Sequence, residues 1–221
     1  MLSSQRKVAH SKKARVLRYI VSMPELSLSK SVLLTDFGLC VNRYRISTPG
    51  IYVCFHVPVI LDKETRFVPG LVAQVNHGRF KQCDATEEGF KGPPNFVLDV
   101  FGPDELDEYE SRRSSFERFG VVEYVALIAD EHTTCHWNRL DDSDGKKFVS
   151  VEPDDNGVIK SKALPGLWFS TNHAKDRDWW TLIDLVDRGI TRLGHHEFME
   201  TIFHKDGRKE EWGDWMPFDA G

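Results

Sequence analysis

One carboxylate inside an apolar stretch is the residue whose position most strongly suggests chemistry. Asp99 interrupts the run NFVLDVF at residues 95–101. An ionised carboxyl group in an apolar strand is costly unless it is paired, hydrogen-bonded or bound to a metal. The run ends at Gly102, Pro103 and Asp104, and such strand-to-helix turns are where α/β sheets place ligands. Asp99 is therefore a candidate site residue, and the alternative is a carboxylate that leaves the sheet or accepts bonds from the following turn.

A second candidate pair follows on the predicted helix 104–119. Glu108 and Arg112 are four residues apart, so both lie on one helix face. They form either a surface ion pair worth about 0.3–0.5 kcal/mol or a face that turns back toward Asp99. The second arrangement sets a guanidinium beside a carboxylate-bound metal and a phosphate.

Other chemistry-bearing residues give weaker signals. The pairs His195-His196 and Cys135-His136 are adjacent in sequence, and adjacent side chains diverge on a helix and point to opposite faces of a strand. A metal site at either pair is therefore not favoured. The common nucleotide-binding, hydrolase and zinc-protease motifs do not occur. The four cysteines form no C-x-x-C pair, which favours a reducing cytoplasm over a zinc site or disulfides.

Composition indicates a globular protein without a membrane span. The chain has 221 residues, 40% of them hydrophobic and 29% charged, with a mean hydropathy of −0.40. Its longest apolar runs, such as 51–57, are too short to cross a bilayer, and no signal peptide is expected. The net charge of −5 argues against nucleic-acid binding through the overall field. Contact with DNA then requires a local patch, and the basic start of the chain is either a solvated tail or a phosphate-contacting arm (Arg6, Lys7, Lys12, Lys13, Arg15 and Arg18).

The elements that position these residues follow from hydrophobic periodicity. A helix over 27–45 precedes two strands, 51–61 and 66–75, that form a predicted hairpin. Residues 76–94 read as a polar loop. The strand 95–101, the helix 104–119 with Asp104 as N-cap and Gly120 as its end, and the strand 121–129 form a βαβ unit with parallel strands.

The rest of the chain is predicted to complete the sheet and then turn helical. Strands are expected at 133–140 and 147–151, and residues 158–168 are expected to lead out of the core. Helices follow around Trp179 to Val186 and Phe198 to Phe203, and the end of the chain carries Trp212 and Trp215. This order predicts an α/β (α+β) fold with a mixed central sheet flanked by helices.

Three segments, in this order and spacing, resemble a known family. Residues 93–100, PPNFVLDV, resemble its P-D-L-V-V-E-V strand. Residues 120–124, GVVEY, resemble its G-V-P-E-Y-W strand, and residues 161–167, SKALPGL, resemble its S-x-x-L-P-G-L segment. The family is the Uma-two family of restriction endonucleases, within the PD-(D/E)XK nuclease superfamily, and the resemblance covers roughly residues 28–170.

The resemblance implies a restriction-endonuclease-like fold that cleaves DNA phosphodiesters with Mg²⁺. Two carboxylates hold the metal in such sites, and a lysine polarises the water and the phosphate. Asp99 matches the second carboxylate, as metal ligand and catalytic group, and Arg112 stands where the family has its lysine. The first carboxylate falls on Gly70, which supplies no ligand. Asp62 or Glu64 is the candidate substitute in the hairpin.

The expected organisation is a basic segment (1–26), a restriction-endonuclease-like domain (27–171) and a C-terminal helical extension (172–221). One hypothesis is a Mg²⁺-dependent DNA endonuclease whose site, built on Asp99, Glu108 and Arg112, is impaired. The alternative is a pseudonuclease, a degenerate relative that binds DNA or a protein without cleaving. A third is a structural role in which the aromatic tail forms a homodimer.

Overall fold

The computed structural model describes residues 26–141 and 146–203. Its helices are α2 (Leu28–Ile46), α3 (Leu106–Phe119), α4 (Thr171–Lys175), α5 (Trp179–Ile190), α6 (Leu193–Phe203) and the short 3₁₀ helix η1 (Gly78–Phe80). Its strands are β1 (Ile51–Phe55), β2 (Val59–Ile60), β3 (Arg66–Phe67), β4 (Leu71–Val75), β5 (Asp84–Thr86), β6 (Gly89–Lys91), β7 (Phe96–Phe101), β8 (Glu123–Ile128), β9 (Thr134–Leu140), β10 (Phe148–Ser150), β11 (Val158–Lys160) and β12 (Trp168–Ser170).

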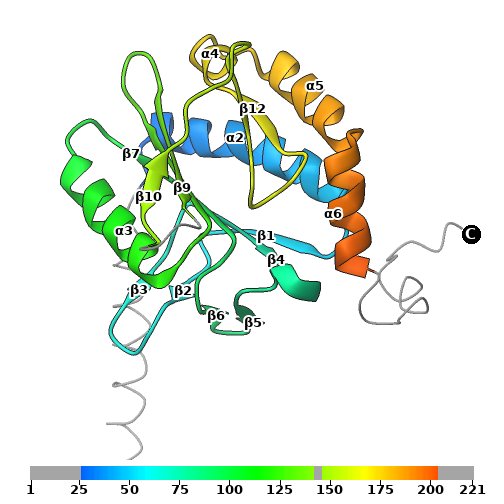
Figure 1. Cartoon of the computed structure of the whole chain (residues 1–221). Helices are drawn as coiled ribbons and strands as arrows, with labels where there is room; N and C mark the ends of the chain where they lie inside the picture. Colours follow the sequence, from blue (N-terminus) through cyan, green and yellow to red (C-terminus); the bar gives the residue numbers. More distant parts are fainter. Residues whose placement is uncertain (1–25, 142–145, 204–221) are drawn as a thin grey trace, which may run out of the picture.

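A mixed sheet forms the centre of the molecule. Its six strands run in the order β1-β4-β7-β8-β9-β10. The neighbours β7 and β8 are parallel, as the βαβ unit predicts, and the remaining pairs are antiparallel. Helices α2, α5 and α6 lie on one side of this sheet and α3 on the other (Figure 1). The predicted fold class, a central mixed sheet flanked by helices, is confirmed.

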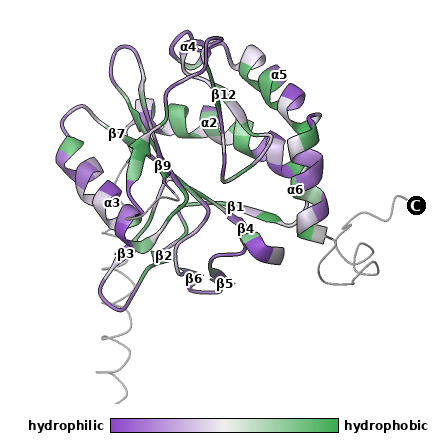
Figure 2. Ribbon diagram, in the orientation of Figure 1, coloured by the Kyte–Doolittle hydropathy of each residue, from purple (hydrophilic) through white to green (hydrophobic). Residues whose placement is uncertain are grey.

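Alternation along the strands divides the interior into two cores. Phe96, Leu98 and Val100 of β7 join the core that faces α2, α5 and α6. Val97 and Phe101 join the core that faces α3. Successive side chains of a strand point to opposite faces, so Asp99 lies on the α3 side. In Figure 2 hydrophilic residues dominate the outer surface of α3, and hydrophobic ones follow the central strands.

The predicted hairpin of strands 51–61 and 66–75 exists, but it bends between two sheets. β1 pairs with β4 in the central sheet, whereas β2 pairs with β3 in a smaller sheet of order β3-β2-β6-β5. The chain turns at His56, whose φ is 52°, and the His56 N–H donates to the Gly70 carbonyl at 3.2 Å. The sequence does not show this corner, because the strand segments on both sides of it are apolar and bury side chains.

Two connections are more ordered than predicted. The polar loop 76–94 contains η1 and the β5–β6 hairpin, which completes the small sheet. Residues 158–168 do not lead out of the core. β11 and β12 pair there, and Ile159, Leu164 and Leu167 are buried in the α2-side core. The turn between β11 and β12 folds inward, so its apolar residues pack against the sheet.

The bounds of α2 and α3 agree with the sequence except at one cap, whereas α5 continues to Ile190 and α6 begins at Leu193, before the expected Phe198. Ser27 caps α2 through its hydroxyl, and Gly120 ends α3 in the left-handed region with φ of 87°. The N-cap of α3 is Glu105 rather than the predicted Asp104, and its carboxylate accepts from the Gly102 N–H instead of the helix. Inside α2, a Cβ on Gly38 would meet the Phe55 ring at 2.5 Å, so glycine at this position permits close packing.

The two C-terminal helices complete the α2-side core. Leu182 and Val186 of α5 and Phe198 and Ile202 of α6 are buried together with the core residues of α2. Among residues 26–141 and 146–203, no helix has the length and apolarity that a membrane crossing requires. The basic N-terminal residues, Trp212 and Trp215 lie outside the described residues.

Candidate active site

Asp99 is buried and fully engaged by hydrogen bonds. The residue is 4% exposed. Its Oδ1 accepts from the Gly70 N–H at 2.9 Å, and its Oδ2 accepts from the Tyr124 hydroxyl at 3.2 Å. The alternative in which Asp99 leaves the sheet is therefore wrong. Its partners come from the residue before β4 and from β8 rather than from the following turn.

Arg112 of α3 reaches back to this carboxylate. Its Nη1 lies 3.2 Å from both Asp99 oxygens, and its Nε and Nη2 donate to Glu108 Oε1 at 3.0 and 2.6 Å. The Arg112 side chain is 13% exposed and that of Glu108 is 52% exposed. The structure thus brings the three predicted site residues together, with one guanidinium shared between a buried and an exposed carboxylate.

A small pocket opens beside this ion pair. It has a volume of about 40 Å³ and is lined by Gly70, Asp99, Glu105, Glu108 and Arg112, together with residues of α2 and the corner at His56. Lys30 of α2 forms an ion pair with Glu105 across it. A water molecule needs about 10–15 Å³ of such volume, so the pocket accepts a few waters or a small ion but not a nucleotide.

Burial and ion pairing have opposite effects on the pKa values of Asp99 and Arg112. Burial raises the pKa of Asp99, and the guanidinium of Arg112 with the Gly70 N–H offset only part of that rise. Burial works against the charge of Arg112, yet Asp99 and Glu108 together raise its pKa. Arg112 therefore stays cationic, and it is the partner that allows a carboxylate at this depth.

The donor set around Asp99 does not fit a resident Mg²⁺ ion. Both carboxylate oxygens already accept hydrogen bonds, and a cationic guanidinium occupies the approach to them. Within residues 26–141 and 146–203, no three histidine, cysteine or acidic side chains gather closely enough to hold a metal. Mg²⁺ prefers several oxygen ligands in near-octahedral geometry. The Mg²⁺ cofactor remains a prediction from the resemblance that this arrangement does not favour.

The position expected for the first carboxylate is at the pocket. Gly70 donates its N–H to Asp99, so the glycine lies beside the acid, as its place in the resemblance implies. A Cβ there would meet Leu34 Cδ1 at 3.0 Å and the Leu98 carbonyl at 3.2 Å. A side chain at this position therefore needs Leu34 to move.

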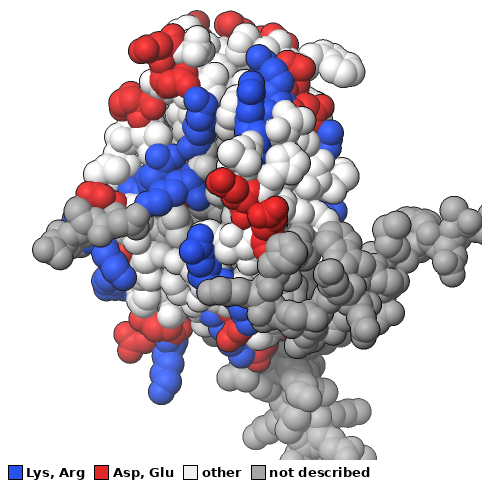
Figure 3. All heavy atoms as spheres, turned by 45° about the vertical axis from the view of Figure 1, so that its right-hand side comes forward, with Lys and Arg blue, Asp and Glu red and all other residues white. Residues whose placement is uncertain are grey.

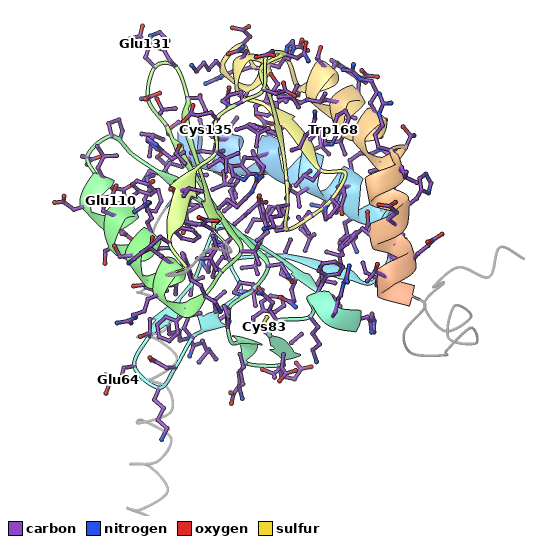
Figure 4. All side chains as sticks on the ribbon, in the orientation of Figure 1. Glu64, Cys83, Glu110, Glu131, Cys135 and Trp168 are labelled. Carbon is purple, nitrogen blue, oxygen red and sulfur yellow. The ribbon has the colours of Figure 1, made fainter. Side chains whose placement is uncertain are left out.

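The two proposed substitutes for that carboxylate lie elsewhere. Asp62 accepts from the Glu64 and Thr65 N–H groups of its own turn, and neither acid lines the pocket. Glu64 projects from the tip of the loop between β2 and β3 (Figure 4). The polar connector thus forms a turn and supplies no group to Asp99.

Sequence reasoning missed two residues that complete the site. Tyr124 lies on β8, and its hydroxyl is aimed at Asp99. Its signal was the βαβ unit itself, because the parallel register sets Asp99 opposite Ala126 and leaves Tyr124 on the same face two residues away. Lys30 had no local signal, since only the tertiary packing of α2 brings it to Glu105.

The weakly favoured metal pairs have ordinary structural partners. His195 is 5% exposed, and its Nε2 lies 2.9 Å from the Thr48 hydroxyl. His136 stacks on the Tyr109 ring with the centroids 5.2 Å apart. Both histidines therefore contribute to packing between distant segments.

A second buried carboxylate links the family-like segments. Glu123 is fully buried and accepts from Arg139 Nε at 2.7 Å. It also accepts from the Ser161 hydroxyl at 2.5 Å and the Lys162 N–H at 2.9 Å. The GVVEY and SKALPGL segments are therefore in direct contact. The residues by which these two segments resemble the family hold the sheet and the β11–β12 turn together.

Comparison with known proteins shows the fold of this chain. No family model matches the sequence, and no curated protein matches it. A similar solved structure is that of a "putative nuclease belonging to DUF820" from Anabaena variabilis. The two share 13% identity with a TM-score of 0.52, over 74% of this chain and 84% of that chain. The chain thus has a nuclease-like α/β fold.

Proposed function

We propose that this chain is a pseudonuclease, a nuclease-fold protein that does not hydrolyse phosphodiesters and acts as a binding module. The observation that supports this most directly is the contact of Arg112 Nη1 with both oxygens of Asp99 at 3.2 Å. A metal-dependent site needs these oxygens free to coordinate the ion. Here a fixed cation neutralises them, and Gly70 offers no second carboxylate.

Charge balance within the pocket supports the same proposal. The two lining cations, Lys30 and Arg112, are each paired with carboxylates of the chain. A scissile phosphate entering the pocket would have to displace these partners. The pocket volume of about 40 Å³ is also far below the roughly 300–1,000 Å³ of ligand pockets. A nucleic-acid or protein partner then contacts a different surface.

A DNA endonuclease of the PD-(D/E)XK type, built on Asp99, Glu108 and Arg112, is the second candidate. One observation favours it: Glu108 is 52% exposed, so its ion pair with Arg112 opens at little cost. Arg112 would then be available to clamp a phosphate. In this candidate Asp99 still acts as the metal ligand.

A nicking assay separates the two candidates. Supercoiled plasmid is incubated with the whole chain and Mg²⁺ or Mn²⁺, with the Asp99→Asn variant as the matched control. The pseudonuclease predicts equal, background levels of nicked plasmid in both samples. Metal-dependent nicking by the wild type that disappears in Asp99→Asn would overturn the proposal and establish the endonuclease.

Direct metal titration adds an activity-independent readout. Calorimetry with Mn²⁺ is expected to give no saturable heat for the wild type. The Gly70→Asp/Arg112→Lys variant restores a second carboxylate and the family's lysine, and saturable heat in this variant alone supports a degenerate metal site. Saturable heat in the wild type that Asp99→Asn removes would contradict the proposal.

A further inference from the structure

A second hollow among the described residues lies far along the chain from Asp99. It has a volume of about 390 Å³ and lies between the β11–β12 hairpin and α5. Trp168 marks it in Figure 4, on β12 beside α5. Its size falls within the roughly 300–1,000 Å³ typical of small-molecule sites, whereas the Asp99 pocket of about 40 Å³ does not.

One wall of this cleft is the outer face of the β11–β12 hairpin, and the other is one face of α5. Lys160 and Trp168 are direct cross-strand partners, so both point to the outer face of the hairpin while Ile159 and Phe169 point into the core. Thr181, Leu185 and Arg188 of α5 also line the cleft. They are spaced i, i+4, i+7 and therefore share one helix face. The cleft is thus built by regular elements with fixed directions.

The lining includes the aromatic ring of Trp168, the cations Lys160 and Arg188, and the carboxylate of Asp154. Lys160 Nζ lies 5.0 Å from the Trp168 ring centroid, and the Arg192 guanidinium lies 5.6 Å from it. Lys160 and Arg188 both line the cleft. An indole ring accepts a planar base by stacking, and cations favour a phosphate. Because Lys160 lies over the ring, stacking requires this exposed side chain to move from the ring to the phosphate.

The cations hold only weak internal partners. Lys160 Nζ is 3.0 Å from Asp154 with its side chain 53% exposed. Arg188 Nε is 3.0 Å from Asp184 with its side chain 55% exposed. Exposed pairs of this kind contribute roughly 0–1 kcal/mol, so both cations can exchange a carboxylate for a phosphate. This contrasts with Arg112, whose side chain is 13% exposed and whose partner Asp99 is buried.

One histidine adds a directed polar group. His173 of α4 lines the cleft, and its Nδ1 lies 3.4 Å from Asp178 Oδ2. Asp178 also accepts from the Thr181 hydroxyl at 2.5 Å, which fixes the carboxylate. The opposite ring nitrogen, Nε2, is then the atom available to a ligand.

Acidic side chains set the limit on what binds here. Figure 3 turns the side that carries α5 and α6 forward, and lysine and arginine are interspersed with aspartate and glutamate on it. Such a face does not attract a long polyanion through its overall field. It suits a compact ligand whose phosphate meets the cleft cations directly.

We propose that the cleft between the β11–β12 hairpin and α5 binds a nucleoside phosphate, with the base against Trp168 and the phosphate on Lys160 and Arg188. The same chemistry is offered by a free mononucleotide and by the terminal nucleotide of a single strand. The proposal does not depend on whether Asp99 supports cleavage.

Calorimetric titration of the whole chain with 5′-AMP tests the proposal. Saturable binding is expected, and Lys160→Ala or Arg188→Ala should weaken it about tenfold or more, since each removes a charge-assisted hydrogen bond. The matched control is Lys91→Ala, because Lys91 is 50% exposed and paired with Glu88 outside the cleft. This variant should bind as the wild type does, and unchanged thermal melting of all three variants excludes misfolding.

Three further ligands decide the details. Inorganic phosphate and adenosine should each bind at least about tenfold more weakly than 5′-AMP, because each lacks one half of the recognised chemistry. A 5′-phosphorylated trinucleotide that binds with the same dependence on Lys160 and Arg188 would identify a strand end as the source. Phosphate binding as tightly as 5′-AMP, no saturable binding of either nucleotide, or binding insensitive to both variants would overturn the proposal.

Discussion

Two buried carboxylates on neighbouring parallel strands have different surroundings. Asp99 of β7 faces α3 and borders a pocket, whereas Glu123 of β8 faces the β11–β12 side and is 0% exposed. Each is paired with an arginine and accepts a backbone N–H. The register sets Phe96 opposite Glu123 and Asp99 opposite Ala126, so the acids lie at different levels of the sheet. An acid within a strand is therefore not by itself a sign of a catalytic group.

The partners distinguish the two acids. Glu123 contacts Arg139 of β9 and the segment 161–163, which only the finished fold brings together. Asp99 shares Arg112 with the exposed Glu108. Both arginines are largely buried, with Arg139 24% and Arg112 13% exposed. The difference is that Arg112 has a second carboxylate partner, the 52% exposed Glu108. This difference predicts different costs when each acid is removed.

The largest effect is expected at Glu123. Glu123→Ala leaves Arg139 and the Ser161 hydroxyl without their shared acceptor, so the free energy of unfolding should fall by about 3–5 kcal/mol. Urea denaturation measures it. Glu88→Ala is the control, because Glu88 is 71% exposed, and it should change stability by less than about 0.5 kcal/mol. A smaller loss for Glu123→Ala than for Asp99→Ala would reverse the comparison.

The Asp99 pair should cost less to break and should be coupled. Asp99→Asn and Arg112→Met are each expected to lower the free energy of unfolding by roughly 1–3 kcal/mol. Arg112 keeps Glu108 as a partner in the first variant, which limits the loss. The double variant should lose less than the sum of the two, by about 0.5–3 kcal/mol. Additive losses in the same urea series would show that the two side chains do not stabilise each other.

The elements around Asp99 were predictable from the sequence to different degrees. The strand, the following helix and the parallel return strand have strong periodicity, and Gly120 marks the helix end. The i, i+4 spacing predicted one face for Glu108 and Arg112 but left two orientations open. Only packing of α3 through Tyr109 and Phe116 turns that face toward Asp99. The spacing of residues along a helix determines which side chains share a face. The packing of the helix against the core determines which residues that face contacts.

The rest of the molecule shows where sequence reasoning fails. Pro58 indicates a bulge or an edge within the strand 51–61, but the strands on both sides of the corner at His56 remain apolar, so the sequence does not show that they join different sheets. The segment 158–168, which follows Asp154-Asp155-Asn156-Gly157, was expected to lead out of the core, but its turn at 161–167 folds inward. Glu123, on β8, accepts hydrogen bonds from the Ser161 hydroxyl and the Lys162 N–H of that turn. Long-range hydrogen bonds of this kind leave no periodic signal.

A glycine substitution tests how tightly the Asp99 side is packed. Gly70→Ala places a Cβ 3.0 Å from Leu34 Cδ1 and 3.2 Å from the Leu98 carbonyl. The free energy of unfolding should fall by about 1–2 kcal/mol, as in other overpacked sites. Gly194→Ala on α6 is the control, since no atom lies within 4 Å of the added carbon. Thermal melting should show the control unchanged or stabilised, and equal effects at both positions would refute the packing argument.

The smallest effect is a difference in pH dependence between two acids of the same pocket. Burial raises the pKa of Asp99 in the fold, so this group adds stability at low pH that is lost as pH rises through its folded pKa. The Gly102 N–H and Lys30 lower the pKa of Glu105. Its contribution is therefore present above the unfolded pKa, about 4.3, and is lost as pH falls.

Urea titrations of two neutral variants measure that difference. As pH falls from 7 toward 4, the stability of the wild type relative to Asp99→Asn should rise. Relative to Glu105→Gln, the stability of the wild type should fall over the lower part of this range. Parallel curves for both variants would mean that the two acids titrate alike in the fold.

The corner shared by β1–β2 and β3–β4 separates two parts of one strand pair. Its inner half belongs to the central sheet, and its outer half ends in the exposed turn at residues 62–65. Because the His56 N–H donates to the Gly70 carbonyl and closes the corner, we expect a change in loop length beyond it to leave the Asp99 pocket unchanged. The tip is thus a natural attachment point, where a fluorophore or an inserted peptide can report on the protein without disturbing its interior.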